Sequence, residues 1–366
     1  MQRCWTTALA CTLLCDSMRG AVGGDPRGGQ HQIDIARVDS FAEAPTPWVL
    51  MDWRARAASL DSFLESDAAR DSGFVWWTAA NPSPLLPRAA TTMAISSYAN
   101  ATQFKPGSSE GLPVMGAVLG AAVARVGLQH HNVTRAEAAT LKYFSPAGIF
   151  RDFPNAATGG SFWYDVAPSI FAASLSDLFP ESRPLRNLTR HSIQQWVTAA
   201  ETMRYNFTHT AYSFATSSPV NNGKWLEADA AAGISWLAFM GSRASSGGAD
   251  AARQLRCAQK SMEALEAMSW NPLYEMQLPF GALTAARLNA EAGASFDVRK
   301  LLNWSLTPNE PLGNQLPDAP PGATRSGWGA VSGRWGGKTV DGLIGSSSDG
   351  GGCECENQQL LLPFLA

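Results

Sequence analysis

The sequence predicts a mainly helical protein built from antiparallel helical hairpins. Apolar residues recur at spacings of three and four in several segments, as they do along one face of a helix. These segments are rich in Ala and Gly and are apolar on more than one side, which is typical of helices that pack between other helices. No segment shows the alternation of strands and helices that a parallel α/β fold requires.

The first predicted helix covers 54–66, and 73–77 is expected to be a strand or a buried loop. Residues 78–107 contain four prolines and are therefore predicted to form a loop. Further helices are predicted from apolar stripes and from cap and stop residues at 112–126, at 162–178 before Pro180, after a cap at Thr189, at 234–240 before Gly241, at 255–265, and at 278–288 before Gly293.

Composition and charge exclude several classes of protein. Apolar residues make up 45% of the 366 residues, so the chain can form a sizeable core. The net charge is −3 and no basic face is present, so we expect no binding to nucleic acid. We also expect no cofactor and no metal: Cys353 and Cys355 lack the further ligands of a zinc site, and no H-E-x-x-H motif or P-loop occurs.

The N-terminal segment is typical of an exported protein. Residues 1–23 resemble a signal peptide, with one early arginine and an apolar run too short to span a membrane. Residues 24–47 are expected to be a linker or disordered leader, and 346–366 an irregular, low-complexity tail. We therefore predict a secreted protein that does not associate with a membrane after signal removal. N-glycan acceptor motifs occur at Asn100, Asn132, Asn187, Asn206 and Asn303.

Acidic and aromatic residues fall together in short segments around 109–110, 159–165, 223–229 and 270–275, each before an apolar helix. Sugar rings stack on aromatic faces, and their hydroxyl groups bond to carboxylates, so this combination favours a carbohydrate cleft. Glycoside hydrolysis also needs two carboxyl groups, one of them protonated. The candidate catalytic residues are Glu227, Glu275, Asp165 and Asp229. The candidate substrate-binding residues are Glu110, Trp163, Tyr164, Trp225, Tyr274, Arg334 and Trp335.

Structural roles for the same residues stay open. An acid just before a helix often caps its free N–H groups, and Asp229 precedes three alanines in this way. The tryptophans can equally belong to the core. Nucleophilic catalysis by serine is disfavoured, because no G-x-S-x-G elbow occurs.

Six stretches together resemble a group of six-hairpin (α/α-toroid) glycosidase-like proteins. They are SSEGLPVMGAVLGA (108–121), GGSFWYDVAPSIF (159–171), PVNNGKWLEADAAAGISWL (219–237), NPLYEMQLPFGALTAARLNAE (271–291), DVRKLLNW (297–304) and GWGAVSGRWGGKTVDGLIGSSSDGGG (327–352). The resemblance spans about 50–350, with the domain placed at 48–345. It implies an (α/α)6 toroid whose inner loops form an acidic, aromatic cleft, but it assigns no reaction.

The sequence departs from the family pattern after residue 352. The relatives continue into further helices, whereas this chain reads CECENQQLLLPFLA. About eight helices are predicted where a closed toroid has twelve. The resemblance therefore implies an incomplete ring, either from a truncated gene model or from a genuinely shortened protein.

Three functions follow as hypotheses, all with an oligo- or polysaccharide as ligand. The first is hydrolysis of glycosidic bonds by paired carboxylates, with Glu227 paired with Glu275 or Asp165. The second is a non-catalytic glycan-binding or decayed protein. The third is a polysaccharide lyase, which would need Tyr164 or Tyr274 as base beside Arg334.

Overall fold

The computed structural model describes residues 53–64, 66–71, 75–79, 91–96, 109–124, 133–154, 156–223, 226–245, 247–274, 277–306, 332–335 and 338–341. The predicted signal peptide, leader and tail lie outside these residues, as do Asn100 and Asn132. Asn187 and Asn206 are exposed, and Asn303 is half-buried.

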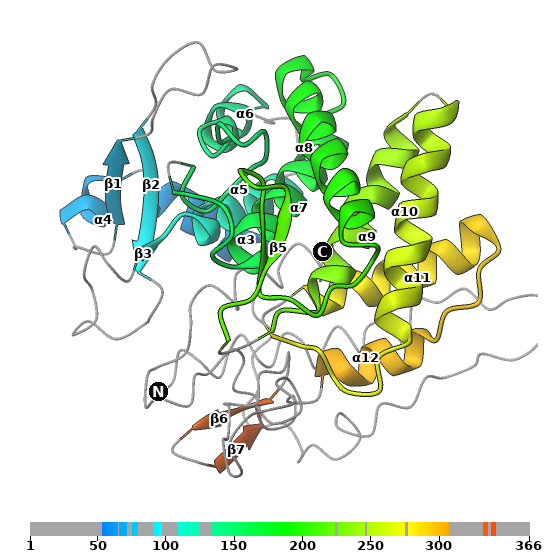
Figure 1. The fold of residues 1–366 in the computed structure, drawn as a ribbon. Coiled ribbons are helices and arrows are strands. Elements are labelled where there is room, and N and C mark those ends of the chain that lie inside the picture. Colours follow the sequence, from blue (N-terminus) through cyan, green and yellow to red (C-terminus); the bar gives the residue numbers. More distant parts are fainter. Residues whose placement is uncertain are drawn as a thin grey trace, which may run out of the picture.

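Helices dominate the described part of the chain, which confirms the mainly helical fold (Figure 1). They are α3 (Trp53–Leu64), α4 (Asp67–Asp71), α5 (Leu112–Ala124), α6 (Val133–Leu141), α7 (Phe162–Leu178), α8 (Arg183–Thr202), α9 (Ala230–Ala244), α10 (Ala249–Glu266), α11 (Leu278–Ala292) and α12 (Val298–Leu306). Among the described helices, none is both long and apolar enough to cross a membrane.

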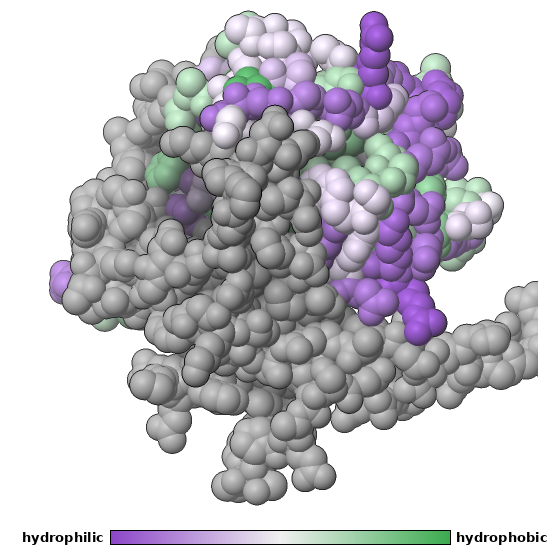
Figure 2. All heavy atoms as spheres, turned by 60° about the horizontal axis from the view of Figure 1, so that its bottom comes forward, coloured by the Kyte–Doolittle hydropathy of each residue, from purple (hydrophilic) through white to green (hydrophobic). Residues whose placement is uncertain are grey.

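The helices from α5 onward form two layers of hairpins. The inner helices α5, α7, α9 and α11 pack against one another in that order. The outer helices α6, α8, α10 and α12 each pack on the inner helix that precedes them in the chain. Nearly every residue of α5 is buried, whereas α8 and α10 bury one face only, as expected for inner and outer positions. Hydrophilic side chains gather on the side where α10, α11 and α12 lie (Figure 2).

Small residues allow the inner helices to approach closely. A Cβ atom added at Gly281 of α11 would lie 2.7 Å from the Cβ of Ala232 in α9. One added at Gly233 of α9 would lie 2.7 Å from Cγ1 of Val166 in α7. Both distances are shorter than real Cβ contacts, so the packing of α7, α9 and α11 depends on these glycines.

Three small antiparallel sheets accompany the helices. The first joins β1 (Val75–Ala79), β2 (Thr91–Ser96) and β3 (Ser109–Glu110), with Ile95 opposite Glu110. The second is the hairpin of β4 (Ala211–Ser213) and β5 (Ser218–Val220), and the third pairs β6 (Ser332–Trp335) with β7 (Lys338–Asp341). The prediction of a loop throughout 78–107 was wrong at β2, which pairs with both of its neighbours.

The observed helix boundaries agree best with the predicted ones where the capping residue is adjacent to the helix in the sequence. Helix α7 covers the predicted 162–178. Helix α11 ends at Ala292 and is capped by Gly293, which adopts a left-handed conformation with φ 66°. The predicted cap at Thr189 was wrong. Helix α8 begins earlier because Ser182 accepts the N–H of Leu185 and Pro184 occupies the first turn. Helices α4, α6 and α12 had not been predicted.

Candidate functional site

The acidic residues that precede the inner helices bond to the backbone of neighbouring hairpins near the N-terminal ends of those helices. In each of three cases, the acid lies in the loop before one inner helix. Its partner is a backbone N–H group at the start of a neighbouring inner helix or in the loop before that helix. The acids therefore link successive hairpins. Two of the three acids, Asp152 and Glu227, accept otherwise free N–H groups at a helix start.

Glu227 lies before α9 and is fully buried. One of its oxygens, Oε2, accepts the Ser161 hydroxyl at 2.7 Å and the Trp163 N–H at 2.8 Å. Ser161 is itself the N-cap of α7. The structure thus gives this predicted catalytic acid a capping role on the neighbouring helix, because its carboxylate serves the first turn of α7.

Asp165 is also fully buried, in the first turn of α7. Its Oδ1 accepts the Nε–H of Arg151 at 2.5 Å, and the Arg151 side chain is only 6% exposed. Burial raises the pKa of Asp165 from 3.8 to about 6, although the Arg151 charge acts in the opposite direction. Desolvation therefore outweighs the ion pair at this carboxyl group.

Asp229 precedes α9 at the N-cap position, but its side chain makes no cap hydrogen bond to that helix. Its Oδ2 instead accepts the N–H of Tyr274 at 3.3 Å. The interpretation of Asp229 as a side-chain cap of α9 was therefore wrong. The carboxylate connects the start of α9 to the loop before α11 and brings two predicted site residues together.

Among the predicted acids that the structure describes, Glu110 alone is half-buried and not fully buried. It lies in β3 just before α5, and its Oε1 accepts the hydroxyl of Tyr164 at 2.7 Å. A further acid, Asp152, is buried beside it, and the N–H of Leu112 donates to Asp152 Oδ1 at 2.5 Å. Burial, and then the charge of Glu110, raise the pKa of Asp152 well above its usual value. The site thus contains a neighbouring pair of carboxyl groups in different environments.

The backbone of α7 and β3 positions Asp152. Pro168 lies inside α7 and cannot donate to the carbonyl of Tyr164, which therefore accepts the N–H of Asp152 at 3.0 Å. Gly111 permits the close approach of this segment, because a Cβ there would lie 2.5 Å from the Asp152 carbonyl oxygen and 2.5 Å from Cε1 of Tyr143. The Glu110–Asp152 pair is consequently held by two helix starts and one strand.

Asp152 and Arg151 were missed by the sequence analysis. Both lie in the segment Ile149–Phe153, which combines acid and aromatic residues as the chosen segments do. The segment was overlooked because no apolar helix follows it directly. A search for acid and aromatic residues without that requirement would have found it.

The aromatic candidates differ in accessibility. Trp163 is 2% exposed and packs in the core, which leaves no face of its ring for a sugar. Tyr164 and Tyr274 are half-buried. Trp225 and Glu275 lie outside the described residues, and so do the side chains of Arg334 and Trp335 in β6, on which the lyase hypothesis depends.

We expect Asp165 to make the protein more stable in mild acid. Its pKa of about 6 in the folded state exceeds the usual 3.8. Between these values the folded chain keeps a proton that the unfolded chain releases, so stability falls as the pH rises from 3.8 to 6. At 1.36 kcal/mol for each unit of pKa, the loss is roughly 3 kcal/mol.

The variant Asp165→Asn has no titrating group at this position. Urea unfolding at pH 4 and pH 7 should therefore show that the unfolding free energy of the wild type falls by about 3 kcal/mol more than that of the variant. An equal pH dependence in both proteins would contradict this assignment.

Within the described residues, no three His, Cys, Asp or Glu side chains cluster in a way that could hold a metal ion. Comparison of the chain with protein-family models, curated proteins and solved structures found no match.

Proposed function

We propose that the protein is a carbohydrate-active enzyme that hydrolyses glycosidic bonds at the Glu110–Asp152 pair. The observation that carries the proposal is the environment of the two carboxyl groups. Asp152 is buried with a raised pKa, as suits a protonated general acid. Glu110 is half-buried, with Oε1 bonded to Tyr164 and with Oε2 buried and without a hydrogen-bond partner among the described residues. A protonated acid beside a second carboxylate is the arrangement that glycoside hydrolysis requires.

In this reaction Asp152 gives its proton to the oxygen of the leaving sugar as the glycosidic bond breaks. Glu110 either removes a proton from the attacking water, which inverts the anomeric carbon, or attacks that carbon itself, which retains its configuration. The Tyr164 hydroxyl orients Glu110 in both cases.

We further propose that the hairpins belong to an (α/α)6 toroid. The order of packing supports this, because successive inner helices contact one another and each outer helix lies on its own inner partner. In such an arrangement the starts of the inner helices share one end of the ring. Export and N-glycosylation are also part of the proposal, and the exposure of Asn187 and Asn206 supports accessible acceptor sites.

The test is hydrolysis of a panel of oligosaccharides, measured through the reducing ends that it releases. Glu110→Gln and Asp152→Asn should each lower kcat by about 100-fold or more, the usual contribution of a general acid or base. Glu291→Gln, a change at an exposed ion pair, is the matched control and should keep full activity. NMR of the first product then shows whether the anomeric configuration is inverted or retained.

Non-catalytic glycan binding is the second candidate, favoured by one observation. Glu227, Asp165 and Asp229 are all fully buried and bonded within the protein, so their burial serves the structure. Binding of oligosaccharides by the full chain with no turnover would support this candidate and would overturn hydrolysis.

A further inference from the structure

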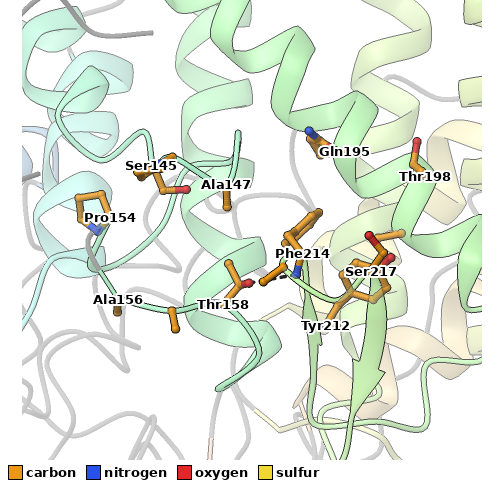
Figure 3. Close-up of a pocket in the computed structure, with 14 residues that line it drawn as sticks. Ser145, Ala147, Pro154, Ala156, Thr158, Gln195, Thr198, Tyr212, Phe214 and Ser217 are labelled. Carbon is orange, nitrogen blue, oxygen red and sulfur yellow. Dashed lines mark hydrogen bonds between the residues drawn. The ribbon is translucent and has the colours of Figure 1, made fainter. Parts of the chain in front are cut away.

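A groove of about 650 Å³ lies between the loop 145–158, helix α8 and the β4–β5 hairpin (Figure 3). Its volume falls within the roughly 300–1,000 Å³ of typical small-molecule sites. None of the carboxyl groups of the candidate site lines it. The groove is therefore a separate feature from the Glu110–Asp152 pair.

Hydrogen bonds to residues outside and within the lining fix the walls of the groove. The guanidinium of Arg151 donates to the carbonyl oxygens of Ala156 and Ala157, the latter at 3.2 Å, and both residues line the groove. On the other side, the N–H of Phe214 donates to Oγ1 of Thr158 at 3.0 Å. The loop is thus tied to the buried Arg151, and the hairpin is tied to the loop.

The groove lining has a specific chemistry. None of its residues carries a charged side chain, and the hydroxyl and amide groups of Gln195, Thr198 and Ser217 come from two of its walls. The ring of Phe214 is half-buried and is fixed by edge contacts with Trp196 at 5.0 Å and Tyr212 at 5.1 Å. The guanidinium of Arg253 donates to the Thr198 hydroxyl at 3.1 Å but is itself paired with Glu201, so an ionic ligand would lose its hydration without an unpaired counter-charge from the lining.

We propose that this groove binds a neutral oligosaccharide. The ring of Phe214 packs against the C–H face of a pyranose, and Gln195, Thr198 and Ser217 bond to its hydroxyl groups. The choice of a saccharide among neutral polar ligands rests on the proposed function. Saccharide binding in the groove does not involve the carboxyl groups of Glu110 and Asp152. The groove would therefore bind a part of the saccharide that lies away from the bond to be cleaved.

Binding is tested with maltotriose, cellotriose and xylotriose as neutral probes and trigalacturonate as the acidic probe, by NMR titration of the full chain. We expect at least one neutral trisaccharide to bind about tenfold or more tightly than trigalacturonate. Phe214→Ala should weaken that binding by about tenfold or more, and Ala215→Trp, which fills the groove with a bulky ring, should do the same. Phe63→Ala, at an exposed ring on α3 that does not line the groove, is the matched control.

The outcomes separate this proposal from hydrolysis. Loss of trisaccharide binding in a folded Ala215→Trp variant, with binding kept in Glu110→Gln, supports the groove whether or not any bond is cleaved. The groove proposal is overturned if no neutral trisaccharide binds, if trigalacturonate binds as tightly, or if Ala215→Trp binds like the wild type. Turnover that persists in Ala215→Trp without groove binding leaves the hydrolase intact and assigns the groove no role in the reaction.

Discussion

Replacing Arg151 by methionine is expected to lower the free energy of unfolding by about 3–5 kcal/mol at pH 7. The guanidinium pairs with Asp165 and donates to three backbone carbonyl groups of the loop 153–157. The variant leaves a buried carboxylate without its cation and several carbonyl oxygens without their donor. The loss should be smaller at pH 4, because Asp165 can then take up a proton.

Chemical denaturation followed by circular dichroism measures this effect, with Arg243→Met as the matched control. Arg243 pairs with Glu291 on the surface, where both side chains are more than a third exposed. Such a pair contributes at most about 1 kcal/mol. Equal effects of the two substitutions would contradict the assigned role of Arg151.

Replacing Glu227 by alanine is expected to lower the free energy of unfolding by about 2–5 kcal/mol. The change leaves the Ser161 hydroxyl and the Trp163 N–H without their buried acceptor, and each such group costs about 1–3 kcal/mol. Glu227→Gln keeps an acceptor oxygen at this position and should be clearly less destabilised than the alanine variant.

The matched control for this cap is Asp297→Ala. Asp297 accepts the N–H of Lys300 at 2.9 Å at the exposed start of α12, so it performs the same task in contact with water. Its loss should cost about 1 kcal/mol. A Glu227→Ala variant as stable as Asp297→Ala would show that Glu227 does not hold the start of α7.

The helical fold was predictable because its determinants are local. The apolar spacing of 162–178 and the glycine at 293 depend on neighbouring residues in the chain, and both predictions were confirmed. Strand β2 was not predictable in the same way, because it is defined by pairing with β1 and β3. At Thr189 the cap prediction failed because the stronger local signal, Ser182 followed by Pro184, comes earlier.

The candidate site was predictable in its residue types but not in its contacts. The structure places Glu110, Glu227 and Asp229 before inner helices, as predicted, whereas Asp165 lies within the first turn of α7 and Glu275 lies outside the described residues. Whether an acid is buried depends on the neighbouring hairpin, as with Glu227, whose partners lie 64 and 66 residues away. The role of Asp152 depends on a carbonyl group left free by Pro168 in another element, which no local pattern indicates.

We propose that chemistry takes place at Glu110 and Asp152, whereas Glu227 holds the structure. The most direct measurement compares oligosaccharide hydrolysis by Glu110→Gln and Glu227→Gln at equal concentrations of folded protein. We expect Glu227→Gln to release reducing ends at close to the wild-type rate and Glu110→Gln to release them about 100-fold more slowly, or more slowly still. Activity retained in Glu110→Gln and lost in folded Glu227→Gln would contradict this proposal.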